Sequence, residues 1–134
     1  MRVLFAAMAC LICLSAIARA GEDVATAQAV IKAQEEAFRR DDAAEAYAFA
    51  APGLKSYYRT PETFMYMVRN GYEPVYRHRS FEFGEARIAD GKIYQDVQII
   101  DEAGEAWDAQ YTLEPQEDGS LKISACILKK SVVS

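Results

Sequence analysis

The chain has 134 residues, of which 20 are acidic and 15 are lysine or arginine, so its formal net charge is −5 at pH 7. An acidic chain does not suit the phosphate backbone of nucleic acid, and it gains no electrostatic attraction to anionic lipid. We therefore expect no nucleic-acid partner. The length fits one domain with its own hydrophobic core.

The first residues have the organisation of a secretory signal peptide. Arg2 gives a positive start, residues 3–14 are apolar, and residues 15–20 are mostly small before polarity begins at Gly21. The apolar run is shorter than the roughly 20 residues that a membrane span needs. We predict a signal peptide over residues 1–20 and a single domain over residues 21–134. This domain would be periplasmic or secreted, and not membrane-embedded after cleavage.

Cysteine usage predicts no disulfide in the exported part. Cys10 and Cys13 lie in the predicted signal peptide, and neither has the neighbours of a lipoprotein signal. Cys126 is then alone, in an apolar strand pattern. We expect it to be buried and to pack as a small hydrophobic side chain.

Three helices are predicted before any strand. Apolar residues recur at helical spacing over residues 23–40, and the charged residues of the opposite face are expected in solvent: Lys32, Glu35, Glu36 and Arg39. Asp42 is a good N-cap for a helix over residues 43–50, which Pro52-Gly53 would end. Thr60-Pro61 predicts the start of a third helix, with a stop at Asn70-Gly71 where glycine would adopt the left-handed conformation.

After Pro74 the apolar period changes to two, which predicts strands. The alternation changes parity across Gly84, as at a β-bulge, and Asp90-Gly91 predicts a type I′ hairpin turn. The last strand is almost continuously apolar, so we expect it to be central. The predicted strands cover residues 75–80, 81–88, 92–100, 107–113 and 121–129, with loops at 101–105 and 115–120. Helices followed by an antiparallel meander predict an α+β fold, with helices packed on one face of a curved sheet.

A symmetric loop at 101–105 would pair Asp96 with Gln110 and Gln98 with Asp108, and would place all four on one sheet face. If that face is concave, a carboxylate near Tyr94 can act as a general base. If it is the solvated back of the sheet, these residues are ordinary surface groups. Both alternatives stay open at this point.

Three segments carry a family resemblance. They are Val30-Ile31-x-Ala33-Gln34-x-x-Ala37-Phe38, then Asp41-Asp42 with Ala46-Tyr47-x-Phe49-Ala50-x-Pro52, and Thr60-Pro61-Glu62-x-Phe64-x-x-Met67-Val68-Arg69-x-Gly71-Tyr72-x-Pro74-Val75-Tyr76-Arg77. They resemble the family catalogued as domain of unknown function 4864, found in small exported bacterial proteins. That family is similar in turn to the nuclear-transport-factor-2-like, cystatin-like superfamily, which implies a helix layer wrapped by a bent sheet and a cone with a pocket. The superfamily holds both enzymes and non-catalytic binders, so the resemblance implies no single activity.

Few residues are candidates for chemistry. His78 is the only histidine and has no partners for a metal site, so we expect an ordinary surface or edge residue. A basic and aromatic patch has two alternatives: it holds an anionic ligand, or it is a structural corner whose arginines pair with nearby acids. The patch consists of Arg69, Tyr72, Tyr76, Arg77 and Arg79.

The aromatic residues near the expected mouth of the cone complete the candidate site. Tyr57 and Tyr58 would line this mouth with Trp107 and Tyr111, although aromatics at such spacings are commonly core. We assign no catalytic residue, no metal ligand and no cofactor. The candidate ligand-binding residues are Tyr57, Tyr58, Tyr72, Arg77, Tyr94, Asp96, Trp107 and Asp108.

Three functions follow as hypotheses. The favoured one is non-catalytic binding of a small ligand or a partner protein through the cone pocket. The second is an isomerase- or dehydratase-like enzyme with Asp96 or Asp108 as base and a tyrosine, Tyr57 or Tyr94, that polarises the substrate. The third is an oligomerising module of the cell envelope, a homodimer through the outer sheet face.

Overall fold

A computed structural model describes the backbone of residues 2–132 and the side chains of residues 19–132. Helices come first and an antiparallel sheet follows, so the predicted α+β class is confirmed. A cone of the cystatin-like kind stays a prediction. The helices are α1 (Arg2–Arg39), α2 (Ala43–Ala48), α3 (Pro52–Tyr58), α4 (Pro61–Gly71) and α5 (Glu73–Tyr76), and the strands are β1 (His78–Ala89), β2 (Lys92–Asp101), β3 (Ala106–Pro115) and β4 (Leu121–Lys130).

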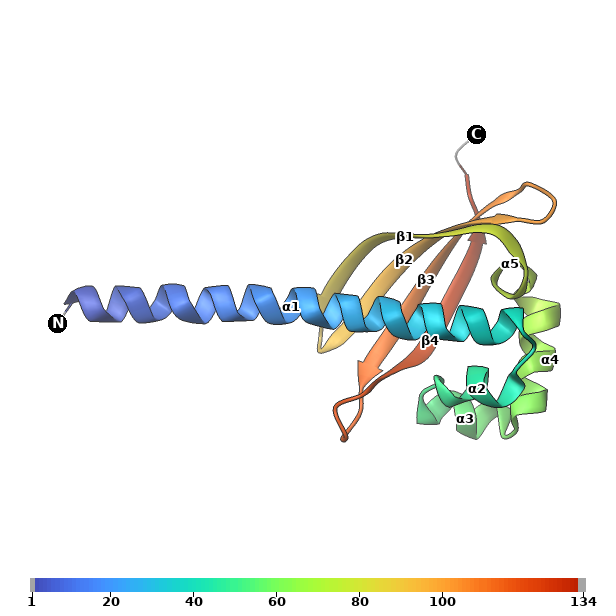
Figure 1. Cartoon of the computed structure of the whole chain (residues 1–134), viewed down its shortest axis with the longest axis horizontal. Helices are drawn as coiled ribbons and strands as arrows, with labels where there is room; N and C mark the ends of the chain where they lie inside the picture. The colour runs from blue at the N-terminus through green and yellow to red at the C-terminus, as the bar shows by residue number, and fades with distance from the viewer. Residues whose placement is uncertain (1, 133–134) are drawn as a thin grey trace.

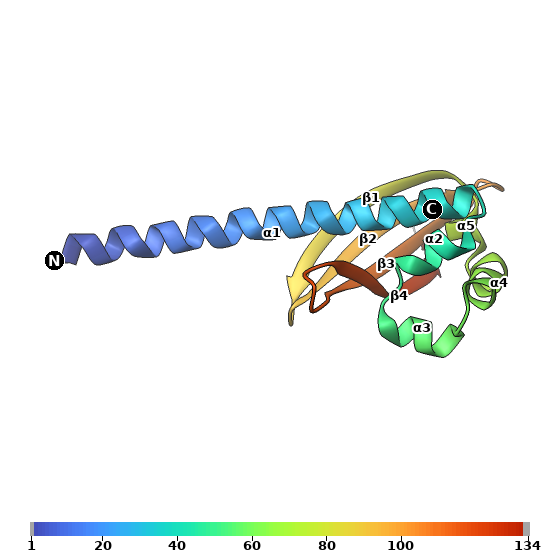
Figure 2. The same ribbon diagram turned by 60° about the horizontal axis from the view of Figure 1, so that its bottom comes forward.

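The sheet bends around the second half of α1, while the first half of this helix projects away from the body (Figure 1). The short helices α2, α3 and α4 gather at the end of the body where α1 finishes, as the turned view also shows (Figure 2). Within the described residues, no helix carries an apolar stretch long enough to cross a membrane.

The core fills the space between α1, α4 and the inner face of the sheet. Phe38 and Ile31 of α1 are almost fully buried, and the Phe38 ring lies 6.3 Å from that of Phe64 on α4. From the sheet, Ile99 and Leu113 are fully buried on the same side. Side chains along each strand therefore point alternately to this buried inner face and to an outer face that none of the described helices covers.

The strand order is β1-β2-β3-β4, and every neighbouring pair is antiparallel. The predicted pairs Asp96 with Gln110 and Gln98 with Asp108 are confirmed. The predicted bulge is confirmed as well, because an extra residue on β1 lies between Phe83 and Ala86. Asp90 and Gly91 have φ of 53° and 74°, as a type I′ turn requires.

Three predicted boundaries of the helical region are wrong. Helix α1 begins at Arg2 rather than at residue 23, because the apolar and small residues before Gly21 also favour a helix. Pro52 begins α3 instead of ending the preceding helix, since proline suits the first helical position. Gly71 stays helical and does not take the left-handed conformation, and the α4 cap is Tyr72.

Two predicted strand features are also wrong. Residues 75–76 belong to the short helix α5, whose first turn contains Pro74, so β1 begins only at His78. Strand β4 lies at the edge of the sheet and not at its centre. Its apolar start is buried because the chain covers it there: Ile123 bonds Phe49 and Ala51 through its backbone, with N···O distances of 2.8 and 2.7 Å.

Candidate functional site

The space between the helices and the sheet holds only a small pocket of about 80 Å³. Its lining is mainly apolar, with polar atoms from Gln34, Tyr58, Tyr72, Tyr111 and Cys126. Among the described residues that line it, none is an aspartate or a glutamate. Ligand pockets commonly measure about 300–1,000 Å³, so this one has room for very few atoms.

Four of the five polar residues around this interior pocket are already hydrogen-bonded or held protonated. The Gln34 amide donates to the Ala46 carbonyl at 3.2 Å, and the Tyr72 hydroxyl donates to the Cys126 carbonyl at 3.0 Å. Burial raises the pKa of Tyr72, and burial raises the pKa of Tyr111 well above its usual value. Cys126 was expected to be buried and is only partly buried against the core. Desolvation there raises the pKa of its thiol to about 12, so this sulfur is not a nucleophile at neutral pH.

A buried carboxylate was missed by the sequence analysis. Glu35 was expected in solvent but is only 3% exposed. Its Oε1 accepts hydrogen bonds from Lys32 Nζ at 2.9 Å and from Arg39 Nη2 at 2.8 Å. The expectation failed because both cations reach the carboxylate from the helix surface, so Glu35 can turn inward and still be paired.

His78 lies against the same carboxylate. Its expected edge position is confirmed, because it begins the edge strand β1, but the expected surface exposure is wrong. Its side chain is 7% exposed, with Nε2 3.7 Å from Glu35 Oε1 and Nδ1 2.9 Å from the Pro74 carbonyl oxygen. The ring also lies 5.1 Å from that of Phe81. These contacts join α1 to the start of β1. Among the described side chains, no three His, Cys, Asp or Glu residues gather as a metal site would require.

Two of the three arginines of the basic patch, Arg69 and Arg77, bond Asp41, which lies two residues beyond the end of α1 with a φ of 56°. Arg77 Nη2 lies 3.1 Å from Asp41 Oδ2, and its Nη1 donates to the Phe38 carbonyl at 2.8 Å. Arg69 and the Tyr76 hydroxyl also donate to Asp41. The Tyr76 hydrogen bond, more than the arginines, holds the pKa of Asp41 below its usual value. These contacts favour the structural-corner alternative.

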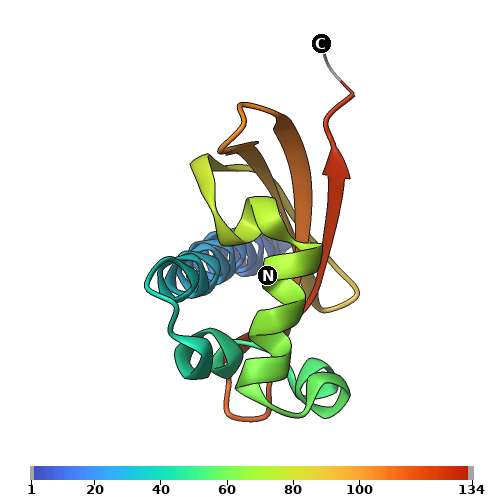
Figure 3. The ribbon, with the colours of Figure 1, turned by 90° about the vertical axis from the view of Figure 1, so that its right-hand side faces the viewer.

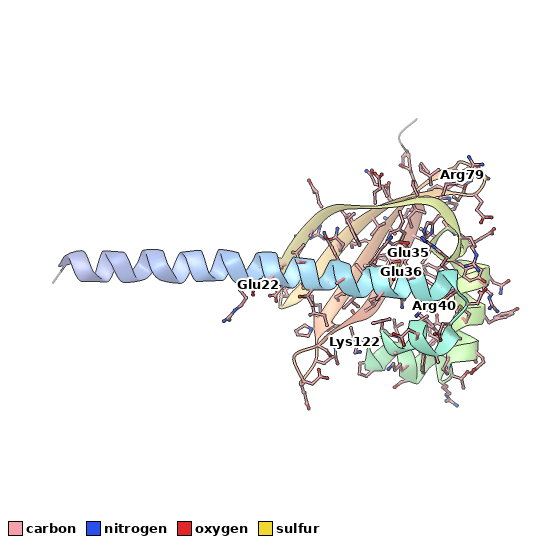
Figure 4. The ribbon with its side chains drawn as sticks, in the orientation of Figure 1. Glu22, Glu35, Glu36, Arg40, Arg79 and Lys122 are labelled. Atoms are coloured by element: carbon pink, nitrogen blue, oxygen red, sulfur yellow. The ribbon has the colours of Figure 1, made fainter. Side chains whose placement is uncertain are left out.

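A larger open cleft of about 610 Å³ lies between the α4–α5 corner and the β2–β3 hairpin, and we call it the hairpin cleft. It brings together Tyr72, Arg77 and Trp107, which were all candidate residues. Glu73, Pro74, the hairpin residues and the end of β4 complete its walls. Figure 4 labels Arg79 near the hairpin end of the sheet. It labels Glu22 at the opposite end of the body, where α1 leaves the sheet.

Trp107 is held in place at the hairpin. Its indole N–H donates to Asp101 Oδ2 at 2.9 Å, and this bond is the main reason why the pKa of Asp101 is lowered. The Lys130 ammonium lies 5.6 Å from the centre of the Trp107 ring and 3.4 Å from Glu105 Oε2. The indole face is therefore a fixed wall of the hairpin cleft.

The remaining candidates lie elsewhere. Asp96 and Asp108 line a second open cleft, also of about 610 Å³, on the outer sheet face, which the helices do not cover. Tyr94 shares this face, where the Arg87 guanidinium lies 5.1 Å from the centre of its ring. Tyr57 is 77% exposed on α3 and lies edge-to-face against Tyr58, which borders the interior pocket. The candidate residues are therefore divided between the two faces of the sheet.

The comparisons with known proteins identify a family and no relative of known activity. The family model described as "Domain of unknown function (DUF4864)" matches residues 20–133. Searches of curated proteins and of solved structures found no match to the chain. The chain belongs to the DUF4864 family.

Proposed function

We propose that this chain is an exported, non-catalytic binding domain that holds a segment of a partner protein in the hairpin cleft. The observation that carries the proposal is the juxtaposition of Tyr72, Arg77 and Trp107 in one open cleft of about 610 Å³. Tyrosine, tryptophan and arginine are the residues that most often dominate protein interfaces. Trp107 and Arg77 are already held by Asp101 and Asp41, so little side-chain entropy is lost on binding.

The interior pocket gives little support to a small ligand held between the helices and the sheet. At about 80 Å³ it is far smaller than usual ligand sites. The amide of Gln34 and the hydroxyl of Tyr72 already bond backbone carbonyls. A small ligand would need the core side chains to move, whereas the hairpin cleft is open to solvent.

The enzyme alternative receives less support from the geometry. An isomerase or dehydratase of the proposed kind needs an aspartate beside a tyrosine in one enclosed pocket. Asp96 and Asp108 share the outer, helix-free face with Tyr94, and Tyr57 is 77% exposed on α3, so no such pair lies in an enclosed pocket among the described residues. The outer cleft is open to solvent, so it would exclude little water around a base.

Export is part of the proposal and has its own support. The family match begins at residue 20, next to the expected cleavage before Gly21. Ala27 is the first buried residue among the described side chains of α1. Cleavage at Gly21 would therefore leave the packed part of the helix intact. The mass of the protein from the periplasm or the medium tests this proposal, since it predicts a chain that starts at Gly21.

Chemical cross-linking in cells that export the chain tests the binding function. We expect an adduct with another protein that the Trp107→Ala variant loses. The neighbouring variant Asp108→Ala is a matched control, because it changes the next residue of β3 on the opposite sheet face. Equal adducts in both variants would contradict binding in the hairpin cleft. An adduct of two copies of the chain that only Asp108→Ala removes would support the oligomerising alternative instead.

A further inference from the structure

We infer that the partner segment binds as an added β-strand on the free half of the β4 edge, beside the hairpin cleft. The inference rests on the proposed function and gives its structural mode. In strand addition, backbone hydrogen bonds supply affinity and every second side chain enters a neighbouring pocket. The argument depends on which backbone groups of β4 point outward, on which of them are covered, and on the charge of the cleft.

The backbone direction along β4 follows from two hydrogen bonds. The N–H of Ser131 donates to the Ala106 carbonyl at 2.9 Å, so this position points toward β3. Hydrogen-bonding direction alternates along an antiparallel strand, so the N–H and C=O groups of Leu128 and Lys130 point away from β3. The contact from the Tyr72 hydroxyl to the carbonyl of Cys126 fits this alternation, because it arrives from the outer edge.

The chain itself covers the first half of this edge. Ile123 bonds both Phe49 and Ala51, and the Cys126 carbonyl is taken by Tyr72. Beyond this point, none of the described residues bonds the outward backbone groups of Leu128 and Lys130. Figure 3 shows β4 as the outermost strand on its side of the sheet. An exposed row of unpaired backbone groups is a template for another strand.

The opposite edge of the sheet is protected differently. Strand β1 carries two irregularities, one between His78 and Ser80 and one between Phe83 and Ala86. At the second, the Gln95 amide bonds the carbonyls of Gly84 and Glu85. Such bulges are a usual defence of an edge strand. From Ala125 to Lys130, in contrast, β4 pairs with β3 in unbroken register, so only its free half offers a regular edge.

The cleft beside this edge defines the chemistry of the added strand. Leu128 and Trp107 give it apolar walls, so every second side chain of the segment should be apolar. Its charged lining is mostly acidic: Glu73, Asp101, Glu102 and Glu105, against Arg77 and Lys130. Arg77 is paired with Asp41 and Lys130 with Glu105, so Glu73, Asp101 and Glu102 carry the remaining negative charge of the cleft. The segment is therefore extended, with apolar residues at alternate positions and lysine or arginine at its ends.

A synthetic peptide with the sequence Lys-Val-Thr-Val-Thr-Val-Lys is the probe for this mode, and its analogue with glutamate ends is the charge control. Amide hydrogen exchange of Leu128 and Lys130 and the fluorescence of Trp107 are followed together. The chain has one tryptophan, so the emission reports the cleft alone. At a peptide concentration about ten times Kd, we expect exchange at both amides to slow roughly tenfold. The glutamate peptide should bind more weakly.

Leu128→Pro and Leu128→Ala form the matched pair of variants. Proline removes an N–H that β3 does not use and is tolerated on an edge strand, while alanine removes the side chain alone. We expect Leu128→Pro to weaken binding roughly tenfold relative to Leu128→Ala. Lys130→Pro, compared with Lys130→Ala, repeats the test at an exposed position if Leu128→Pro does not fold.

The outcomes separate this inference from the proposed function. A Trp107 response without protection of the two amides overturns strand addition and leaves binding in the cleft supported. Protection that appears without peptide and grows with protein concentration means that a second copy occupies the edge, and it overturns the inference. If neither signal changes at millimolar peptide, strand addition by such a segment is wrong, and the cross-linking result decides the proposed function separately.

Discussion

The hydroxyl of Tyr72 donates a hydrogen bond to the backbone carbonyl of Cys126 at 3.0 Å, and so joins the end of α4 to the middle of the edge strand β4. Tyr72 lines both the interior pocket and the hairpin cleft, so its ring separates the two spaces. The same contact ends the covered half of the β4 edge. The Tyr72 side chain therefore borders both the interior pocket and the hairpin cleft, and it marks where the free half of the β4 edge begins.

Tyr72→Phe removes this hydrogen bond and keeps the ring. We expect the free energy of unfolding to fall by about 1 kcal/mol, because the Cys126 carbonyl loses its donor. Tyr57→Phe is the control, since Tyr57 is 77% exposed and the change should have no effect. Denaturant titration of both variants measures the difference. Equal stabilities of the two variants would contradict the role given to Tyr72.

Asp41 makes stability depend on pH in the acid range. Its pKa lies below the usual 3.8 because of the Tyr76 hydroxyl first and the arginines next. A carboxyl with a lowered folded pKa stabilises the fold fully above its unfolded pKa, and loses this contribution as the pH falls through the folded value. Asp41→Asn should therefore flatten the loss of stability below about pH 4, and Tyr76→Phe should flatten it in part. Acid unfolding curves that coincide with the wild-type curve would contradict this account.

Lys32 and Arg39 share the buried carboxylate of Glu35, and each can compensate for loss of the other. We expect Lys32→Ala and Arg39→Ala each to lower the free energy of unfolding by about 1 kcal/mol, and the double variant to lower it by about 3 kcal/mol. Glu36→Gln controls for charge on an exposed neighbour in α1. A double-mutant cycle measures the coupling, and additivity within about 0.3 kcal/mol would show that the pairs are independent.

Cys126 should be inert toward thiol reagents in the folded protein. Its burial raises the pKa to about 12, so almost no thiolate is present at pH 8. In a chain with Cys10 and Cys13 replaced by serine, we expect Ellman's reagent to react only after denaturation. Rapid reaction under native conditions would mean that the interior pocket opens.

Local signals in the sequence predicted much of the fold. Asp42 and Thr60 accept hydrogen bonds as N-caps, and the turn at Asp90-Gly91 has both residues at positive φ. The bulge at Gly84 and the pairing of Asp96 with Gln110 are also as predicted. Each of these features depends on residues close in sequence or on the alternation of one strand, so a single chain is enough to show it.

The predictions that failed concern residues whose burial depends on segments distant in sequence. Glu35 is spaced from Lys32 and Arg39 as in exposed helical ion pairs. Only the packing of α1 on the sheet shows that Glu35 is buried. The apolar start of β4 suggested a central strand because the cover from Phe49 to Ala51 is distant in sequence. The hairpin cleft joins Tyr72 to Trp107 across two layers, and its wall residue Leu128 was not a candidate at all.

Amide chemical-shift mapping tests the central claim, that a partner segment binds in the hairpin cleft, most directly. Isotope-labelled protein is titrated with the Lys-Val-Thr-Val-Thr-Val-Lys peptide. The account predicts shifts gathered at residues 70–77, at the hairpin up to Trp107, and at residues 128–130. Shifts confined to the outer face around Tyr94, Asp96 and Asp108 would contradict it.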